Sequence, residues 1–139
     1  MNKHRNIKTE IDGIKFDSKI EARRWQQLKV LESTGQIGNL RRQVKYVLIP
    51  AQRIDGKLIE HECSYKADFC YYRKGELVVE DVKGYRRGAT YNIFVIKRKL
   101  MLEKHGIRVK EITEKDMGKG HEWNVLAVKI APIEMQNAT

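Results

Sequence analysis

The chain has 139 residues, of which 41% are hydrophobic and 33% are charged. This length suits one folded domain, and the apolar residues are spread along it, which excludes the composition of a disordered chain. The formal net charge of +10 favours a polyanionic partner, either nucleic acid or an anionic membrane surface. No apolar run approaches the roughly 20 residues of a membrane helix, and no hydrophobic segment follows the basic start. We therefore expect a soluble, intracellular protein without a signal peptide.

Neither a linker nor a repeat divides the chain, since its only prolines are Pro50 and Pro132. We expect a single domain over residues 1–139, with frayed ends. The only cysteines, Cys63 and Cys70, form no CxxC pair and are too few for a zinc site. They are expected on opposite faces of one strand, where a disulfide cannot form.

Several segments have the composition of β-strands. The first, residues 7–16, is predicted to be extended with a turn at Asp12-Gly13. The others are residues 43–49, 58–72, 77–83, 107–112 and 126–130. The turn dipeptides Asp55-Gly56 and Lys74-Gly75 join segments 43–49, 58–72 and 77–83, which predicts an antiparallel meander.

Two segments have helical spacing. Ser18 is a predicted N-cap for a helix over residues 19–33, and Glu21 follows at the position that completes a capping box. A second helix is predicted over residues 91–105, where Gly106 ends it. The core order is thus helix, three strands, helix, strand (αβββαβ), which predicts an α/β fold with a mixed β-sheet flanked by helices.

The segment from Leu77 to Lys83 is the most informative part of the sequence. Because side chains alternate along a strand, Asp81 and Lys83 are expected on one face and Glu80 on the other. The turn at Lys74-Gly75 places Asp68 nearly opposite Asp81. Two carboxylates so close repel each other, and a divalent cation relieves the repulsion. Oxygen ligands without histidine or thiolate suit Mg²⁺, with Mn²⁺ as a substitute.

Asp68, followed after a hairpin by Asp81-x-Lys83, with Glu21 on a preceding helix, resembles the PD-(D/E)XK nuclease superfamily. More narrowly, IDGIKFDSK over residues 11–19, EARR over 21–24 and VEDVKG over 79–84 resemble a family of small phage-borne endonuclease-like proteins. The likeness covers about residues 44–112 plus the first helix. The chain has Ala67 where the superfamily name places proline.

The resemblance implies a restriction-endonuclease-like core and a metal-dependent endodeoxyribonuclease, working in the cytoplasm of a bacterial host. It implies that Asp68, Asp81, Glu21 and the backbone carbonyl of Val82 hold the metal. Lys83 would then position or deprotonate the attacking water, or stabilise charge on the phosphate. Glu21 has an equal claim to be only a helix-capping residue, and Asp81 and Lys83 could be an ordinary ion pair.

Several cations are candidates for contacts to the DNA backbone, although a solvated surface charge is the commoner meaning of such residues. They are Arg23, Arg24, Arg86, Arg87 and Lys97. The expected substrate is duplex or branched DNA, such as a recombination or replication intermediate, and a homodimer would serve two-strand cutting. A non-catalytic nucleic-acid-binding protein of the same fold is the alternative, and RNA is a further possible substrate.

Overall fold

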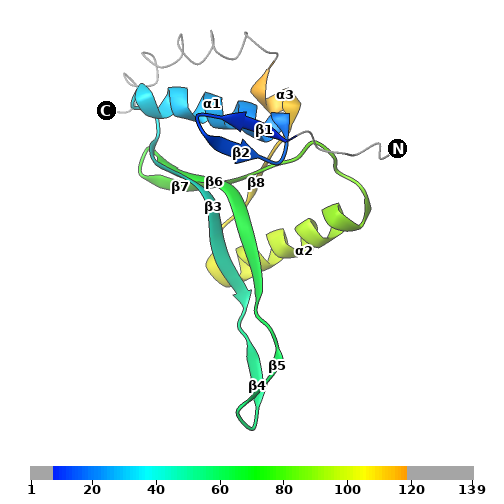
Figure 1. The fold of residues 1–139 in the computed structure, drawn as a ribbon. Coiled ribbons are helices and arrows are strands. Elements are labelled where there is room, and N and C mark those ends of the chain that lie inside the picture. Colours follow the sequence, from blue (N-terminus) through cyan, green and yellow to red (C-terminus); the bar gives the residue numbers. More distant parts are fainter. Residues whose placement is uncertain (1–7, 119–139) are drawn as a thin grey trace.

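A computed structural model of the chain describes residues 8–118. Its elements are β1 (Thr9–Ile11), β2 (Ile14–Phe16), α1 (Lys19–Ser33), β3 (Gly38–Ile49), β4 (Gln52–Ile54), β5 (Lys57–Glu60), β6 (Cys63–Arg73), β7 (Glu76–Val82), α2 (Gly88–His105), β8 (Lys110–Ile112) and α3 (Glu114–Met117). Figure 1 shows α1 and α2 on opposite sides of the main sheet, with the β1–β2 hairpin beside α1.

The main sheet has four strands in the order β3-β6-β7-β8. β3, β6 and β7 are antiparallel neighbours, and β8 runs parallel to β7 after the crossover through α2. The predicted mixed sheet with flanking helices is therefore confirmed, as is the core order αβββαβ. The β1–β2 hairpin and the short helix α3 are added to this core.

All three predicted turn dipeptides close two-residue hairpins. Both residues of each turn have positive φ: 53° and 77° at Asp12-Gly13, 51° and 78° at Asp55-Gly56, and 51° and 78° at Lys74-Gly75. This is the turn geometry whose twist matches that of the flanking strands. The hairpin at Lys74-Gly75 fixes the register of β6 against β7 and so decides which residues face each other at the site.

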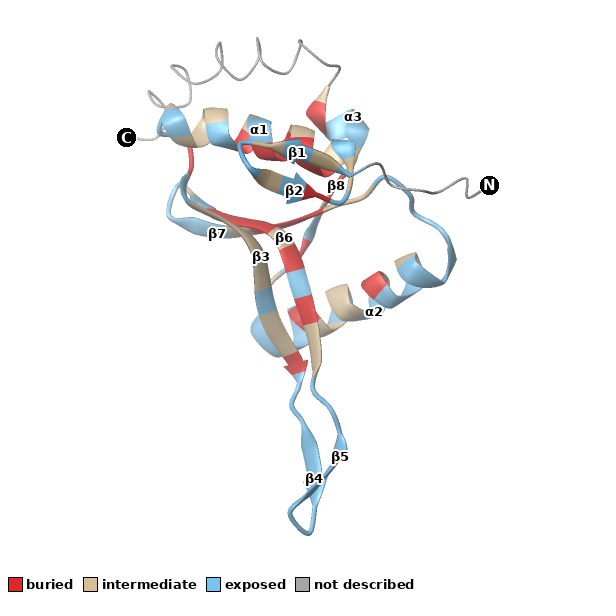
Figure 2. Cartoon of the chain, in the orientation of Figure 1, coloured by how far each residue is buried: buried red, intermediate tan, exposed pale blue. Residues whose placement is uncertain are grey.

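The prediction of one long strand over residues 58–72 is wrong. The chain leaves the ladder at His61 and Glu62, so β5 pairs only with β4 in a separate two-stranded sheet. These strands form an arm, residues 51–60, that projects from the body and is exposed throughout (Figures 1 and 2). β3 begins earlier than predicted, α2 begins at Gly88, and β8 is shorter than predicted. The strand predicted over residues 126–130 lies outside the described residues, as do the ends expected to fray.

Two apolar clusters fill the two faces of the sheet. On the α1 face, Trp25 and Leu28 pack with Phe16, Phe69 and Tyr71. On the α2 face, the buried residues include Tyr65, Ala67, Cys70, Val79, Phe94 and Met101. Burial of both faces fits the run of buried apolar residues Phe69, Cys70 and Tyr71 in β6, which alternate between the two clusters.

The alternation of faces along β6 is interrupted beside Asp68. Tyr65 and Ala67 belong to the α2 face, yet Phe69, which strict alternation would place with them, belongs to the α1 face. The neighbouring strand β3 departs from regular strand geometry at the same level, where Gln43 has a φ of 54°. A left-handed residue inside a strand rotates the chain that follows it. Asp68 therefore lies where the sheet coils and its two faces exchange.

Cys63 and Cys70 lie in β6 and are both free thiols, as predicted. The prediction that they lie on opposite faces is wrong, because Cys63 packs against the cluster that contains Cys70, and the alternation of faces is interrupted between them. None of the helices within residues 8–118 combines the length and the apolar composition needed to span a bilayer.

Candidate active site

Asp68 and Asp81 face each other across β6 and β7. The paired residues of these two strands run as far as Phe69 opposite Glu80, and the next position in the same register pairs Asp68 with Asp81. At this position the N–H of Val82 donates to a side chain instead of a backbone carbonyl, namely to Oδ2 of Asp68 at 2.8 Å. The predicted juxtaposition of the two carboxylates is thus what the structure has.

Both oxygens of Asp81 have partners. The hydroxyl of Tyr65 donates to Oδ2 at 2.6 Å, and Nζ of Lys83 lies 2.9 Å from Oδ1. Lys83 Nζ also lies 3.7 Å from the centroid of the Phe94 ring, where the ring face attracts a cation. Lys83 is therefore held between a strand carboxylate and a ring of α2, with its side chain only 17% exposed.

Glu21 reaches the same site from the first turn of α1. Ser18 caps the helix by accepting the backbone N–H of Glu21 at 3.2 Å. The reciprocal bond from the Glu21 carboxylate is not found among the described residues, since its Oε1 instead accepts Nε2 of Gln43 at 3.2 Å. The capping function at this position thus belongs to the Ser18 side chain, and the Glu21 carboxylate is directed to the site.

Burial, together with the crowding of acids, raises two pKa values in this cluster. Burial, with the charges of Asp81 and Glu21, raises the pKa of Asp68 to about 8, although the Val82 N–H and Lys83 oppose the shift. Burial, Asp17 and Asp81 raise the pKa of Glu21. Groups that resist ionisation because other carboxylates surround them are stabilised by any cation placed among them.

These residues line a cleft of about 600 Å³, here called the carboxylate cleft. Its walls include Glu21, Asp68, Asp81, Val82 and Lys83. Their oxygens are hard donors of the kind that Mg²⁺ prefers. Within residues 8–118, however, no three acidic, histidine or cysteine side chains gather closely enough to form a complete metal-binding group. The donor types fit a divalent cation, and Asp68 with Asp81 is the pair that would hold it.

Arg24, predicted to contact DNA, is placed in the interior rather than on the surface. Its guanidinium is buried and donates through Nε to Oε1 of Glu80 at 2.8 Å, with a second bond to Oε2. Glu80 is fully buried and also accepts the hydroxyl of Tyr71. Arg24 therefore neutralises a buried acid between α1 and β7. Glu80 lies on the face opposite Asp81, as parity predicted, and its contact is with a helix.

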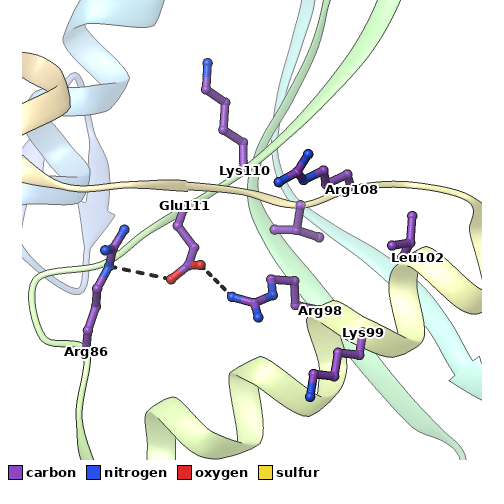
Figure 3. A pocket seen from close by; sticks show the side chains of 8 residues that line it. Arg86, Arg98, Lys99, Leu102, Arg108, Lys110 and Glu111 are labelled. Carbon is purple, nitrogen blue, oxygen red and sulfur yellow. Dashed lines mark hydrogen bonds and ion pairs between the residues drawn. The ribbon is translucent and has the colours of Figure 1, made fainter.

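The other residues predicted to contact DNA lie in different parts of the molecule. Arg23 lines the carboxylate cleft but is paired with Glu114 at 3.0 Å. Arg86 lies on the exposed loop after β7 and lines a second cleft, shown in Figure 3. Arg87 is exposed, with its guanidinium carbon 5.9 Å from the Tyr85 ring. Lys97 lines neither cleft, and Arg98 and Lys99 are the cations of α2 that do.

Sequence reasoning missed two residues that shape the site. Tyr65 bonds Asp81 and belongs to the same cluster as Val79, whose face Asp81 shares, but strict alternation along β6 places Tyr65 on the face away from Asp68. Glu111 lies opposite Asp81 in the parallel β7–β8 register, which no local pattern reveals because α2 intervenes. The alternating charge of residues 107–112 is the one sequence signal that points to Glu111.

The fold and the site together define an α/β protein whose mixed sheet carries a carboxylate–lysine cluster in a cleft. The chain belongs to the family described as "Protein of unknown function (DUF1064)", whose model matches residues 1–119. No curated protein and no solved structure matches the chain.

Proposed function

We propose that this protein is a Mg²⁺-dependent endonuclease of the PD-(D/E)XK type that hydrolyses phosphodiester bonds of DNA. One observation carries the proposal: Asp68 lies opposite Asp81 on adjacent strands, and Lys83, two residues further on, has its ammonium 2.9 Å from Asp81. The order of strands and helices around this cluster supports a restriction-endonuclease-like core. The net charge of +10 supports a nucleic-acid substrate.

Asp68 and Asp81 would hold the metal, with Glu21 contributing directly or through water. Val82 fits as a further ligand, because its N–H points to Asp68 and the N–H and C=O of one strand residue point to the same side. The ion would polarise the scissile phosphate and lower the pKa of a bound water. Mn²⁺, which prefers similar ligands, would substitute for Mg²⁺.

Lys83 would act on the phosphate or on the attacking water. Its ammonium is already fixed by Asp81 and the Phe94 ring, so little reorganisation precedes the reaction. A fixed cation stabilises the charge that develops on the phosphoryl oxygens in the transition state. Tyr65, through its bond to Asp81, is a positioning residue for the same carboxylate.

By analogy with the phage-borne nucleases that the sequence resembles, we extend the proposal to branched or duplex intermediates of recombination or replication. The enzyme would then act in the cytoplasm of a bacterial host, and as a homodimer it could cut two strands at once.

The proposal is tested by incubating the full chain with duplex, single-stranded, flap and four-way-junction DNA, and with RNA, in Mg²⁺, Mn²⁺ or EDTA. We expect cutting of DNA in both metals and none in EDTA. Asp81→Asn should slow cutting by about a hundredfold or more while leaving DNA binding intact. Asp55→Asn, the same change in the exposed turn of the arm, is the matched control and should cut like the wild type.

A non-catalytic nucleic-acid-binding protein is the second candidate. It is favoured by the bonding of Asp81, both of whose oxygens already have partners, and by the lack of a third ligand close by within residues 8–118. Tight, salt-dependent binding of DNA without cutting in either metal would establish this candidate in place of the nuclease.

A further inference from the structure

A second cleft, of about 840 Å³, lies between α2 and β8. Five of its lining residues are cations, drawn from the loop after β7, from α2 and from the β8 segment: Arg86, Arg98, Lys99, Arg108 and Lys110. Figure 3 shows Arg86 and Arg98 on either side of the one acid, Glu111, whereas Lys110 points away from it. We call this hollow the basic cleft. Five cations and one carboxylate leave a net charge of +4 on its walls.

Glu111 holds part of this cluster in place. Its side chain, 15% exposed, accepts Nη1 of Arg98 at 2.7 Å and the hydroxyl of Tyr91 at 2.9 Å, and Nε of Arg86 lies 3.6 Å away. The acid therefore joins the loop after β7 to α2 and fixes two guanidiniums at the cleft. Guanidiniums held in this way are prepared for planar recognition of phosphate.

The other three cations have no such partner. Lys99, Arg108 and Lys110 are exposed, and no ion pair with an acid is found for them within residues 8–118. Like charges gathered around one hollow repel each other, and a bound anion removes that repulsion. A simple solvated helix face would not recruit cations from three separate segments into a concave surface.

We propose that the basic cleft binds the sugar–phosphate backbone of a nucleic-acid strand and leads it to the carboxylate cleft. The two clefts adjoin: Lys83 lines one and Arg86 the other, and Asp81 and Glu111 are opposite each other in the β7–β8 register. The inference rests on the proposed function for the identity of the polyanion as DNA. A concave surface with several separate cations suits a chain of phosphates, whereas a membrane surface is flat.

The test is the binding of a fluorescent DNA duplex to the full chain in EDTA, followed by anisotropy over a range of salt concentrations. The variant is Arg108→Ala/Lys110→Ala, which removes two exposed charges and spares the carboxylate cleft. Lys15→Ala/Lys66→Ala removes the same charge from exposed strand positions elsewhere and is the matched control. Unfolding temperatures of all three proteins establish that each is folded.

We expect the cleft variant to bind at least about tenfold more weakly. The slope of log K against log salt should become shallower by about 2, roughly 1 for each phosphate that no longer meets a cation. The control should bind like the wild type. Equal binding by the cleft variant and the wild type would overturn the inference. So would displacement of the duplex by equimolar inorganic phosphate, or weaker binding of the cleft variant to anionic phospholipid vesicles with unchanged binding to DNA.

The same proteins separate this inference from the proposed function. If the wild type binds the duplex and cuts nothing in Mg²⁺, while the cleft variant binds weakly, the basic cleft is upheld and the nuclease is removed. If the wild type cuts in Mg²⁺ while the cleft variant binds normally, the nuclease is upheld and the basic cleft is overturned.

Discussion

Asp68 is a residue whose ionised form is disfavoured by its surroundings in the fold. It lies where the sheet coils and is only partly exposed, and burial together with two other acids raises its pKa to about 8. Its one protein donor is the N–H of Val82, and no bond to its second oxygen is found among residues 8–118. A carboxylate in this environment is stabilised either by a proton or by a cation. The free protein and the metal-bound protein should therefore respond differently to pH.

The first prediction concerns the pH dependence of stability in EDTA. The pKa of Asp68 is higher in the folded than in the unfolded chain, so its contribution is fully present below the unfolded value, near 3.8, and is lost as pH rises to about 8. Glu21, whose pKa is also raised, acts in the same direction. Thermal unfolding should show a lower midpoint at pH 8 than at pH 5, and Asp68→Asn should reduce this difference.

Added Mn²⁺ provides the complementary observation. Because the ion binds the ionised site, it should raise the unfolding midpoint of the wild type more at pH 8 than at pH 5, and should not do so in Asp68→Asn. Asp55→Asn is again the control for the change from acid to amide. A pH profile that is identical in the wild type and in Asp68→Asn would contradict this view of the site.

At the scale of elements, the buried pair between Arg24 and Glu80 ties α1 to β7, and α1 in turn carries Glu21 to the carboxylate cleft. Arg24→Met should lower the free energy of unfolding by about 3–5 kcal/mol, because it leaves the Glu80 charge buried without its partner. Arg23→Met, one residue earlier, removes a partly exposed pair and should cost no more than about 1 kcal/mol. Urea denaturation measures both, and equal losses would show that the pair is not structural.

The arm formed by β4 and β5 is a second element with a separate prediction. All its residues are exposed and its two strands pair only with each other. Few packing contacts therefore stabilise the arm against local unfolding. Limited trypsin digestion should cut at Arg53 and Lys57 before any other site within residues 8–118. Arg53→Gln/Lys57→Gln should delay this first cut. A first cut at Arg86 or Arg87, read by mass spectrometry, would place the weakest segment in the loop after β7 instead.

At the scale of the whole molecule, two features bring the chemistry together. The hairpin at Lys74-Gly75 sets Asp68 against Asp81, and the crossover through α2 sets β8 beside β7. The segment from Lys83 to Arg86 then separates an acidic hollow from a basic one. In the proposed nuclease, this arrangement would place the metal site beside the surface that binds the DNA backbone.

The local patterns of the sequence predict much of this arrangement. Turn dipeptides, the N-cap at Ser18 and strand parity predict α1, the meander and the opposition of Asp68 to Asp81. The failures are non-local. The break after β5 reflects the separate pairing of the arm, and the faces of β6 on either side of Asp68 depend on an interruption of the strand alternation there. Burial of Arg24 depends on Glu80, which lies 56 residues away in the chain.

The proposed nuclease depends above all on Asp81 as a ligand of the catalytic metal. The rate of DNA cleavage at saturating enzyme in Mg²⁺, compared between the wild type and Asp81→Asn, tests this role most directly. We predict that the substitution lowers the rate by about a hundredfold or more, as expected when a transition-state interaction is removed, and that EDTA abolishes cutting by the wild type. Cutting by Asp81→Asn at the wild-type rate, or cutting that persists in EDTA, would contradict a metal-dependent nuclease centred on Asp81.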